Sequence, residues 1–341
     1  MRRVAVCLLT FPFWFSEASA QQTVTAGAIS SESVADPSAD RSTAAKAASE
    51  AASEADEPLQ EYIRIRRNDS NVAETLETSV IRLEKSARYP GTTVDLIGAI
   101  HLGEAEYYRD LNKLFRQYDV LLFEAVMPAA AVKQGLRPGG GKGSRRVIDE
   151  QAEWNDANIG LAAISVLQLA AKDSLGLSFQ LSDIDYTPRN FVHADMTKEE
   201  LESTMALRGE SFAETMAREM GKEALEQQKS SPVAQQLDFV LSLLASDRLY
   251  RVRRIFAVQL TKANLGTAFA EKDGRSTIIT ERNIKALQVL TQQLKKGKTK
   301  IGIFYGAGHF PDMEKRLVTD FGYERQSEQW LTAWRLAPAT K

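Results

Sequence analysis

Cysteine is almost absent from this chain of 341 residues, and its scarcity excludes two kinds of chemistry. The one cysteine is Cys7, which lies in an apolar segment at the start of the chain. The rest of the chain therefore has neither a disulfide framework nor a catalytic thiol. The position of Cys7 also leaves no room for an ordinary lipoprotein signal before it.

Long apolar runs are missing as well. The segment from Val4 to Phe15 is shorter than the roughly 20 residues that a membrane-spanning helix needs. Positive charge precedes this segment, and Ala18-Ser-Ala20 follows it and fits a small-x-small cleavage site. We therefore predict a signal peptide over residues 1–20, an exported protein that is periplasmic or secreted, and no stable membrane span once the signal is cleaved.

Large apolar residues are scarce between residues 21 and 58, where Ala, Ser, Thr, Asp and Glu predominate. Such a segment buries too little surface to offset the entropy lost on ordering, so we predict a disordered Ala/Ser-rich linker there. Residues 59–341 are then expected to form one large domain. A strong positive charge is lacking too, since the net charge is -2 and the pI is near 6.1. We expect no nucleic-acid partner, because nucleic-acid binders normally carry a basic surface.

The common hydrolase signatures are absent. The chain has no Gly-x-Ser-x-Gly and no His-Glu-x-x-His motif, which removes support for serine and ordinary zincin chemistry. The glycine-rich run from Pro138 to Ser144 lacks the order of a phosphate loop and follows no buried strand. It is interpreted instead as a mobile loop beside the site.

Two apolar runs stand out against these absences, because both end in Gly-x-x-His. The first ends in Gly98-Ala-Ile-His101 and the second in Gly306-Ala-Gly-His309. Each run is typical of a buried strand whose carboxyl end presents the residue that follows it. Since the chain has only three histidines, two of them in matching positions indicate a shared role.

An amphipathic helical pattern and a further strand follow each motif. After His101 they cover Glu104 to Tyr118 and then Asp119 to Glu124, so that the strand ends in a carboxylate. We predict an α/β (α+β) fold, with a central mixed sheet made of two similar strand–Gly-x-x-His–helix–strand units and a helical insertion between them. The other predicted elements are strands over Glu61–Arg66, Ser79–Glu84 and Trp330–Leu336, a core helix over Ile159–Ala171 and a helix over Thr277–Leu294. A further helix is predicted after His309. It carries an apolar stripe of Met313, Leu317, Val318 and Phe321, and it ends at Gly322.

Paired Gly-x-x-His motifs, the first followed by a strand ending in Glu, resemble the TraB/GumN/TIKI family, which is related in fold to erythromycin-esterase-like and ChaN-like proteins. The resemblance covers roughly Thr92 to the C-terminus. It implies that His101, Glu124 and His309 form the catalytic or metal-binding set. An Arg before the second motif, matched here by Arg282, belongs to the same pattern.

The third histidine lies in the segment His193-Ala-Asp195-Met-Thr197, which follows a predicted strand over Leu177–Asp185. The His-x-Asp spacing can place both side chains on one side of an extended segment, which suits a metal ligand or a proton relay. The same segment can also begin a helix, with Thr197 as its N-cap. His193 therefore stays open as a further metal ligand or as a structural residue.

Two functions from different classes are compatible with these residues. Two His and a Glu at strand ends can hold a divalent metal such as Mn, Co or Zn, which would make an exported hydrolase, most plausibly a peptidase or amidase. Without a metal the same groups can act as general base and acid, with Glu124 orienting or activating the attacking water and Arg282 steadying the negative charge that develops. The alternative is a non-catalytic protein that binds a peptide, or haem through a His, in the same cleft. A peptide or small molecule is expected as substrate or ligand, and the sequence does not specify the oligomeric state.

Overall fold

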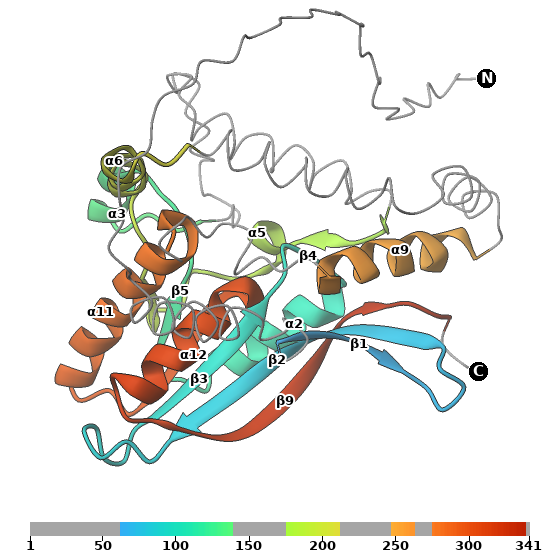
Figure 1. Cartoon of the computed structure of the whole chain (residues 1–341), viewed down its shortest axis with the longest axis horizontal. Helices are drawn as coiled ribbons and strands as arrows, with labels where there is room; N and C mark the ends of the chain where they lie inside the picture. Colours follow the sequence, from blue (N-terminus) through green and yellow to red (C-terminus); the bar gives the residue numbers. More distant parts are fainter. Residues whose placement is uncertain (1–61, 139–174, 212–246, 263–274, 339–341) are drawn as a thin grey trace, which may run out of the picture. The chain divides into compact units, whose positions relative to one another are not determined.

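A computed structural model describes residues 62–138, 175–211, 247–262 and 275–338 of the chain. The chain divides into two units, residues 1–53 and 54–341, and every described residue belongs to the second. Helices surround a mixed sheet in this unit (Figure 1), which confirms the predicted mixed α/β class. The predictions for residues 1–58, for the glycine-rich loop after Pro138 and for a helix over 159–171 lie outside the described residues.

The antiparallel part of the sheet is built around one long strand, β2 (Ala73–Glu84). Strand β9 (Glu324–Arg335) pairs with β2 along nearly its whole length, and the two run side by side in Figure 1. Strand β1 (Ile63–Arg67) pairs with the first half of β2, and β3 (Thr93–Ala99) pairs with the second half. Because a strand has two edges, β1 and β3 share the edge of β2 that β9 leaves free.

Four parallel strands continue the sheet from β3. Strand β8 (Lys300–Gly306) lies between β3 and β5 (Val120–Phe123), and β7 (Phe191–His193) pairs with the far edge of β5. All three pairings are parallel, so the carboxyl ends of these strands meet at one edge of the sheet. Buried apolar residues fill β5 and make up most of β3 and β8, as expected for parallel strands that are covered on both faces.

Three amphipathic helices cover the parallel strands. Helix α2 (Ala105–Phe115) buries Tyr107, Tyr108, Leu111 and Phe115, while α11 (Arg282–Lys295) and α12 (Phe310–Thr319) pack against each other. The predicted stripe on α12 is right for Met313 and Leu317 and wrong for Val318, which is 43% exposed. Gly322 ends this segment with a φ of 71°, as predicted.

The prediction of a strand over Leu177–Asp185 is wrong. Only β6 (Ser178–Phe179) is extended there, and it pairs with β4 (Leu102–Gly103) in a separate two-stranded sheet. The chain then turns into the short helix α5 (Gln180–Asp183). The backbone N–H of Gln180 donates to the His101 carbonyl at 2.9 Å, so a contact with a distant residue decides the local structure in spite of the apolar pattern.

The helix predicted over Thr277–Leu294 begins differently from a regular α-helix. Its first turn is the π-helix η2 (Thr277–Glu281), which leads directly into α11 at Arg282. A π-turn holds one more residue per hydrogen-bonded ring than an α-turn and often occurs at functional sites. Other described helices are α3 (Ala129–Lys133), α6 (Lys198–Arg208), α9 (Arg248–Lys262) and the 3-10 turn η3 (Ala307–His309).

The two Gly-x-x-His units share their first three elements only. After α2, the first unit continues into β5, which joins the parallel part of the sheet beside β8. After α12, the second unit continues into β9, which runs antiparallel to β2 on the other side of the sheet. Thr197 caps α6 through a capping box with Glu200, which confirms the predicted helix start.

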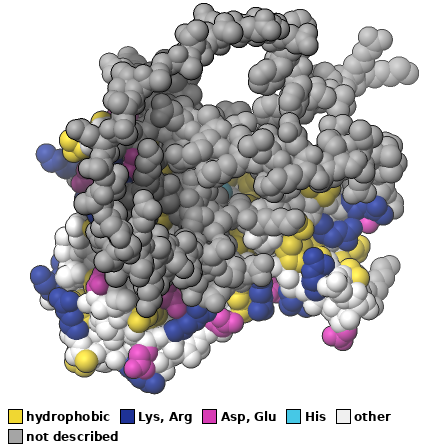
Figure 2. Space-filling view, in the orientation of Figure 1, with side chains coloured by type: hydrophobic (Ala, Val, Ile, Leu, Met, Phe, Trp, Pro, Cys, Tyr) yellow, Lys and Arg dark blue, Asp and Glu magenta, His cyan; other side chains and the backbone are white. Residues whose placement is uncertain are grey.

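The described residues contain no helix that is both long and apolar enough to cross a membrane. On the face shown in Figure 2, acidic and basic side chains of the described residues are interspersed, with apolar side chains between them. This mixture agrees with a net charge of only -2.

Candidate functional site

The predicted site residues lie where the parallel strands end. His101 follows β3, Glu124 follows β5, His309 closes the turn after β8, and His193 is the last residue of β7. Since these strands are neighbours in the order β3-β8-β5-β7, their carboxyl ends place all four residues at one edge. This edge is where α/β sheets usually bind their ligands.

Glu124 is the centre of the contacts at this edge. Its Oε1 accepts a hydrogen bond from Arg282 Nη2 at 2.6 Å, and its Oε2 accepts one from the backbone N–H of Gly306 at 2.7 Å. Burial alone would raise the pKa of Glu124, but the guanidinium of Arg282, together with the neighbouring His309 and His101, outweighs it and holds the pKa well below its usual value. Glu124 is therefore an ionised acceptor at neutral pH.

Gly306 contacts Glu124 at the end of β8. Its φ of -53° suits any residue, so backbone freedom is not the reason for a glycine. A Cβ on residue 306 would lie 3.4 Å from Glu124 Oε2 and 3.8 Å from His309 Cδ2. Both distances are ordinary contacts, so a side chain here would fit but would place a methyl group against the carboxylate that binds the N–H of this residue.

His309 is buried beside Glu124. Its Nε2 lies 3.6 Å from Glu124 Oε1, and its Nδ1 lies 2.7 Å from Asn283 Oδ1. The ring also packs edge-on against Tyr305, with 5.2 Å between the ring centres. Contacts on two sides thus fix the ring, while Nε2 faces the carboxylate.

Arg282 joins two carboxylates at the start of α11. It donates from Nε and Nη2 to Asp195, at 2.9 and 2.6 Å, and from Nη2 to Glu124. The side chain of Asp195 is fully buried and that of Arg282 is 10% exposed. Burial disfavours the charge of Arg282, but the two carboxylates outweigh this effect and raise its pKa well above the usual value. Most of its donors are engaged within the protein.

His101 is more accessible than His309 and has its own partner. Its Nδ1 lies 3.2 Å from Oε1 of Gln180, and Nε2 of Gln180 donates to the Tyr186 hydroxyl at 3.0 Å. His101 is exposed, whereas Gln180 and Tyr186 are buried. The imidazole of His101 is among the groups that lower the pKa of Glu124, so it lies within electrostatic reach of that carboxylate.

His193 makes a different kind of contact. Its Nε2 lies 2.7 Å from the carbonyl of Ala125, and its ring packs edge-on against Phe123. A carbonyl only accepts, so Nε2 carries the proton and only Nδ1 remains to accept a bond. The neighbouring Asp195 pairs with Arg282, so the two residues of the His-x-Asp segment serve separate partners.

Among the described residues, no group of three or more His, Cys, Asp and Glu side chains is arranged to hold a metal ion. The carboxylate oxygen of Glu124 and the imidazole nitrogen of His309 are close enough together to bind one such ion. Their Oε1 and Nε2 atoms are 3.6 Å apart, and two ligand bonds of about 2 Å each span up to about 4 Å. Nε2 of His101 is the remaining donor at this edge, and His193 could contribute only Nδ1.

Several residues of the site were not predicted as such from the sequence. Asn283 and Gln180 hold the two motif histidines, and Tyr305 packs on His309. Asp195 was considered from the sequence only as part of the His-x-Asp segment, and its bond to Arg282 was not predicted. Asn283 and Tyr305 lie next to predicted site elements, so they could have been considered. Gln180 is 79 residues from His101, and no local pattern connects the two.

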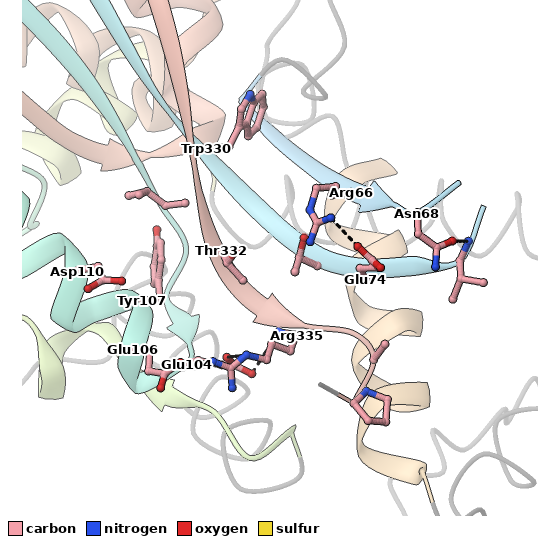
Figure 3. Close-up of a pocket in the computed structure, with 15 residues that line it drawn as sticks. Arg66, Asn68, Glu74, Glu104, Glu106, Tyr107, Asp110, Trp330, Thr332 and Arg335 are labelled. Atoms are coloured by element: carbon pink, nitrogen blue, oxygen red, sulfur yellow. Dashed lines mark hydrogen bonds and ion pairs between the residues drawn. The ribbon is translucent and has the colours of Figure 1, made fainter. Parts of the chain in front are cut away.

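A groove of about 580 Å³ lies elsewhere, between α2, the β1–β2 hairpin and the end of β9 (Figure 3). Its charged side chains pair with one another, Arg66 with Glu74 at 2.5 Å and Arg335 with Glu106. Its lining contains none of the three histidines and not Glu124. The groove is therefore separate from the candidate site.

Comparisons with known proteins find no match to this chain among family models, curated proteins or solved structures.

Proposed function

We propose that this protein is an exported metal-dependent hydrolase, most plausibly a peptidase or amidase, of the TraB/GumN/TIKI type that its motifs resemble. The observation that carries the proposal is the pair formed by His309 and Glu124. A buried imidazole with one fixed nitrogen presents its other nitrogen 3.6 Å from an ionised carboxylate. Pairs of this kind take up a proton from water or bind a cation.

Without a metal, His309 is the proton acceptor in this proposal. Asn283 occupies Nδ1, so Nε2 is the atom that takes a proton from water. Glu124 stays ionised because its pKa is low, and its negative charge stabilises the imidazolium that forms. The imidazole is the base in this arrangement because a carboxylate with a low pKa is a weak base, and Glu124 contributes its negative charge.

Arg282 and His101 support this centre. Arg282 holds Glu124 in place, because its guanidinium binds Glu124 and the fully buried Asp195 together. His101 lies on the exposed side, where it can reach a bound substrate or serve as a further ligand. With a metal, His309, Glu124 and His101 would instead hold a divalent ion such as Mn, Co or Zn, which would lower the pKa of a bound water and so replace the proton transfer to His309.

The test is a hydrolysis assay on the mature protein with a peptide library, with and without added Mn, Co or Zn, alongside elemental analysis. His309→Ala and Glu124→Gln should each lower activity by about 10²-fold or more, the scale of lost acid-base catalysis. Glu84→Gln is the matched control, because Glu84 ends β2, which runs antiparallel to β3, and so lies at the opposite end of the sheet. Activity that survives His309→Ala would exclude the proposed role of this residue.

The same preparation tests the alternative, a non-catalytic binder of a peptide or of haem. Haem uptake through a histidine would give an absorption spectrum that His101→Ala abolishes. Peptide binding without cleavage under every metal condition would also favour the alternative over the hydrolase.

A further inference from the structure

The buried carboxamide of Asn283 has an unambiguous orientation. Its Nδ2 lies 3.0 Å from the carbonyl of His309 and 2.8 Å from Oδ2 of Asp312. Both of these oxygens accept hydrogen bonds, so the atom facing them must be the NH2 group. The remaining atom, Oδ1, is the one that faces His309.

This orientation determines which nitrogen of His309 carries the proton. Oδ1 of Asn283 lies 2.7 Å from Nδ1 of His309, and a carbonyl oxygen only accepts. Nδ1 must therefore be the donor. In the neutral ring the lone pair is then on Nε2, which faces Glu124.

His101 has a partner of the same chemical kind. Gln180, which is 5% exposed, directs its Oε1 to Nδ1 of His101 and its NH2 group to the Tyr186 hydroxyl. Its backbone N–H also donates to the carbonyl of His101, so Gln180 holds this histidine at two points. The amide again makes Nδ1 the donor and leaves the lone pair on Nε2.

His193 has the opposite arrangement. The Ala125 carbonyl accepts from its Nε2, so its neutral ring keeps the lone pair on Nδ1. Of the three histidines of the chain, two thus have a lone pair on Nε2, and in the third Nε2 carries the proton and donates it to a carbonyl.

We propose that Asn283 and Gln180 are positioning residues that hold His309 and His101 as Nδ1–H tautomers, so that both present an Nε2 lone pair to the site. The use of the two lone pairs rests on the proposed function. The tautomers themselves are measured without substrate or ion, so a wrong tautomer and an absent hydrolase activity are separate results. A carboxamide or carbonyl that accepts a hydrogen bond from one ring nitrogen commonly fixes the tautomer of a reactive or metal-binding histidine.

The test is the tautomer of each ring in long-range ¹H–¹⁵N spectra of the ¹⁵N-labelled mature protein, prepared without a histidine tag and with chelator. The spectra are recorded about two pH units above 6.5, the approximate pKa of an ordinary histidine side chain, where an ordinary imidazole is neutral. Three ring systems are expected, each assigned by its loss in one of three single His→Gln variants. His309 and His101 should be Nδ1–H and His193 should be Nε2–H. An Nε2–H or doubly protonated His309 would overturn the proposal for Asn283, and the same result for His101 would overturn it for Gln180.

Two variants separate positioning from general stability. Asn283→Leu removes the acceptor and should move His309 towards the Nε2–H tautomer, while His101 and His193 keep theirs. Asn190→Leu is the matched control, since Asn190 donates two hydrogen bonds to the carbonyls of Phe115 and Tyr118 and contacts no histidine in these bonds. It should lower the melting temperature and leave all three tautomers unchanged. An unchanged His309 tautomer in Asn283→Leu would contradict the proposal, and if that variant does not fold, the wild-type spectrum still decides.

Discussion

At the scale of single residues, one guanidinium determines the geometry of the candidate site. Arg282 is held by Asp195 on one side and holds Glu124 on the other, at 2.6 Å in each case. A buried ion pair adds little net stability over apolar packing, but removing one partner leaves an uncompensated buried charge. The cost of breaking the set therefore depends on which carboxylate is removed.

Asp195→Asn should be the most damaging isosteric change at the site. Asp195 is fully buried and provides two of the acceptors of Arg282, so we expect a loss of about 3 kcal/mol in the free energy of unfolding, as for broken buried pairs. Urea denaturation measures this loss. Glu328→Gln is the control, because Glu328 pairs with Arg325 at 45% exposure and should change stability by about 0.5 kcal/mol or less. Equal effects of the two variants would show that Asp195 does not anchor Arg282.

The low pKa of Glu124 has a consequence for stability against pH. Burial works against the ionised form, but Arg282 and His309 outweigh it and hold the folded-state pKa below the ordinary value, which is about 4.3 in an unfolded chain. A depressed pKa stabilises the folded state above the unfolded pKa, and this contribution is lost as the pH falls through the folded pKa. The free energy of unfolding of the wild type, relative to that of Glu124→Gln, should therefore be constant near neutral pH and fall below about pH 4. Denaturation of both proteins in the presence of chelator at several pH values measures this difference in the free energy of unfolding. A difference that rises on acidification would contradict the prediction.

At the scale of elements, strand β8 contains two glycines that serve different neighbours. A Cβ on Gly302 would lie 2.6 Å from Leu121 Cδ1 in the core, whereas one on Gly306 would lie 3.4 Å from Glu124 Oε2. The first distance requires the core to move. The second is an ordinary contact that places a methyl group against the carboxylate.

Gly306→Ala should therefore affect activity more than stability. We expect a stability within about 1 kcal/mol of the wild type and a loss of activity on the order of tenfold, because small displacements of catalytic groups are costly. Gly302→Ala should show the reverse, with about 1–3 kcal/mol of lost stability from overpacking and full activity of the folded fraction. Thermal unfolding and hydrolysis rates of both proteins make the comparison. Equal activity losses would show that Gly306 has no special relation to Glu124.

The elements differ in how well the sequence predicts them. Periodicity predicts β3, β5, β8 and α2, because each buries a regular stripe of apolar residues, and parallel pairing then brings the two motifs to one edge. It fails for Leu177–Asp185, where the bond between Gln180 and the His101 carbonyl turns the chain. The three residues of β7 are too few for a periodic signal. The carboxamides that hold the histidines also escape prediction, because polar residues of that type occur everywhere in a sequence and only the fold selects two of them.

At the scale of the whole molecule, Tyr62 and the first described strand are in contact with the second motif unit. The Tyr62 ring packs edge-on against Phe310, the residue after His309, and its hydroxyl donates to Glu314 on α12 at 3.0 Å. Tyr62 and Ile63 are each 3% exposed, and β1 adds five residues to the edge of β2. The start of the sheet is thus in contact with the helix that follows the second motif.

Two truncations should separate the folded unit from the chain before it. Removing residues 1–58 leaves β1 and Tyr62 in place, so the free energy of unfolding and the hydrolysis rate should match those of the mature protein that begins near Gln21. Removing residues 1–67 deletes β1, exposes the edge of β2 and takes two buried side chains from the core. Loss of a buried aromatic side chain alone costs about 3–5 kcal/mol, so this variant should unfold at much lower urea concentration or fail to fold. Urea denaturation and the peptide assay are carried out on both proteins. A large loss of stability on removing residues 1–58 would place part of the folded unit before residue 59. Full stability without β1 would show that the sheet does not need this strand.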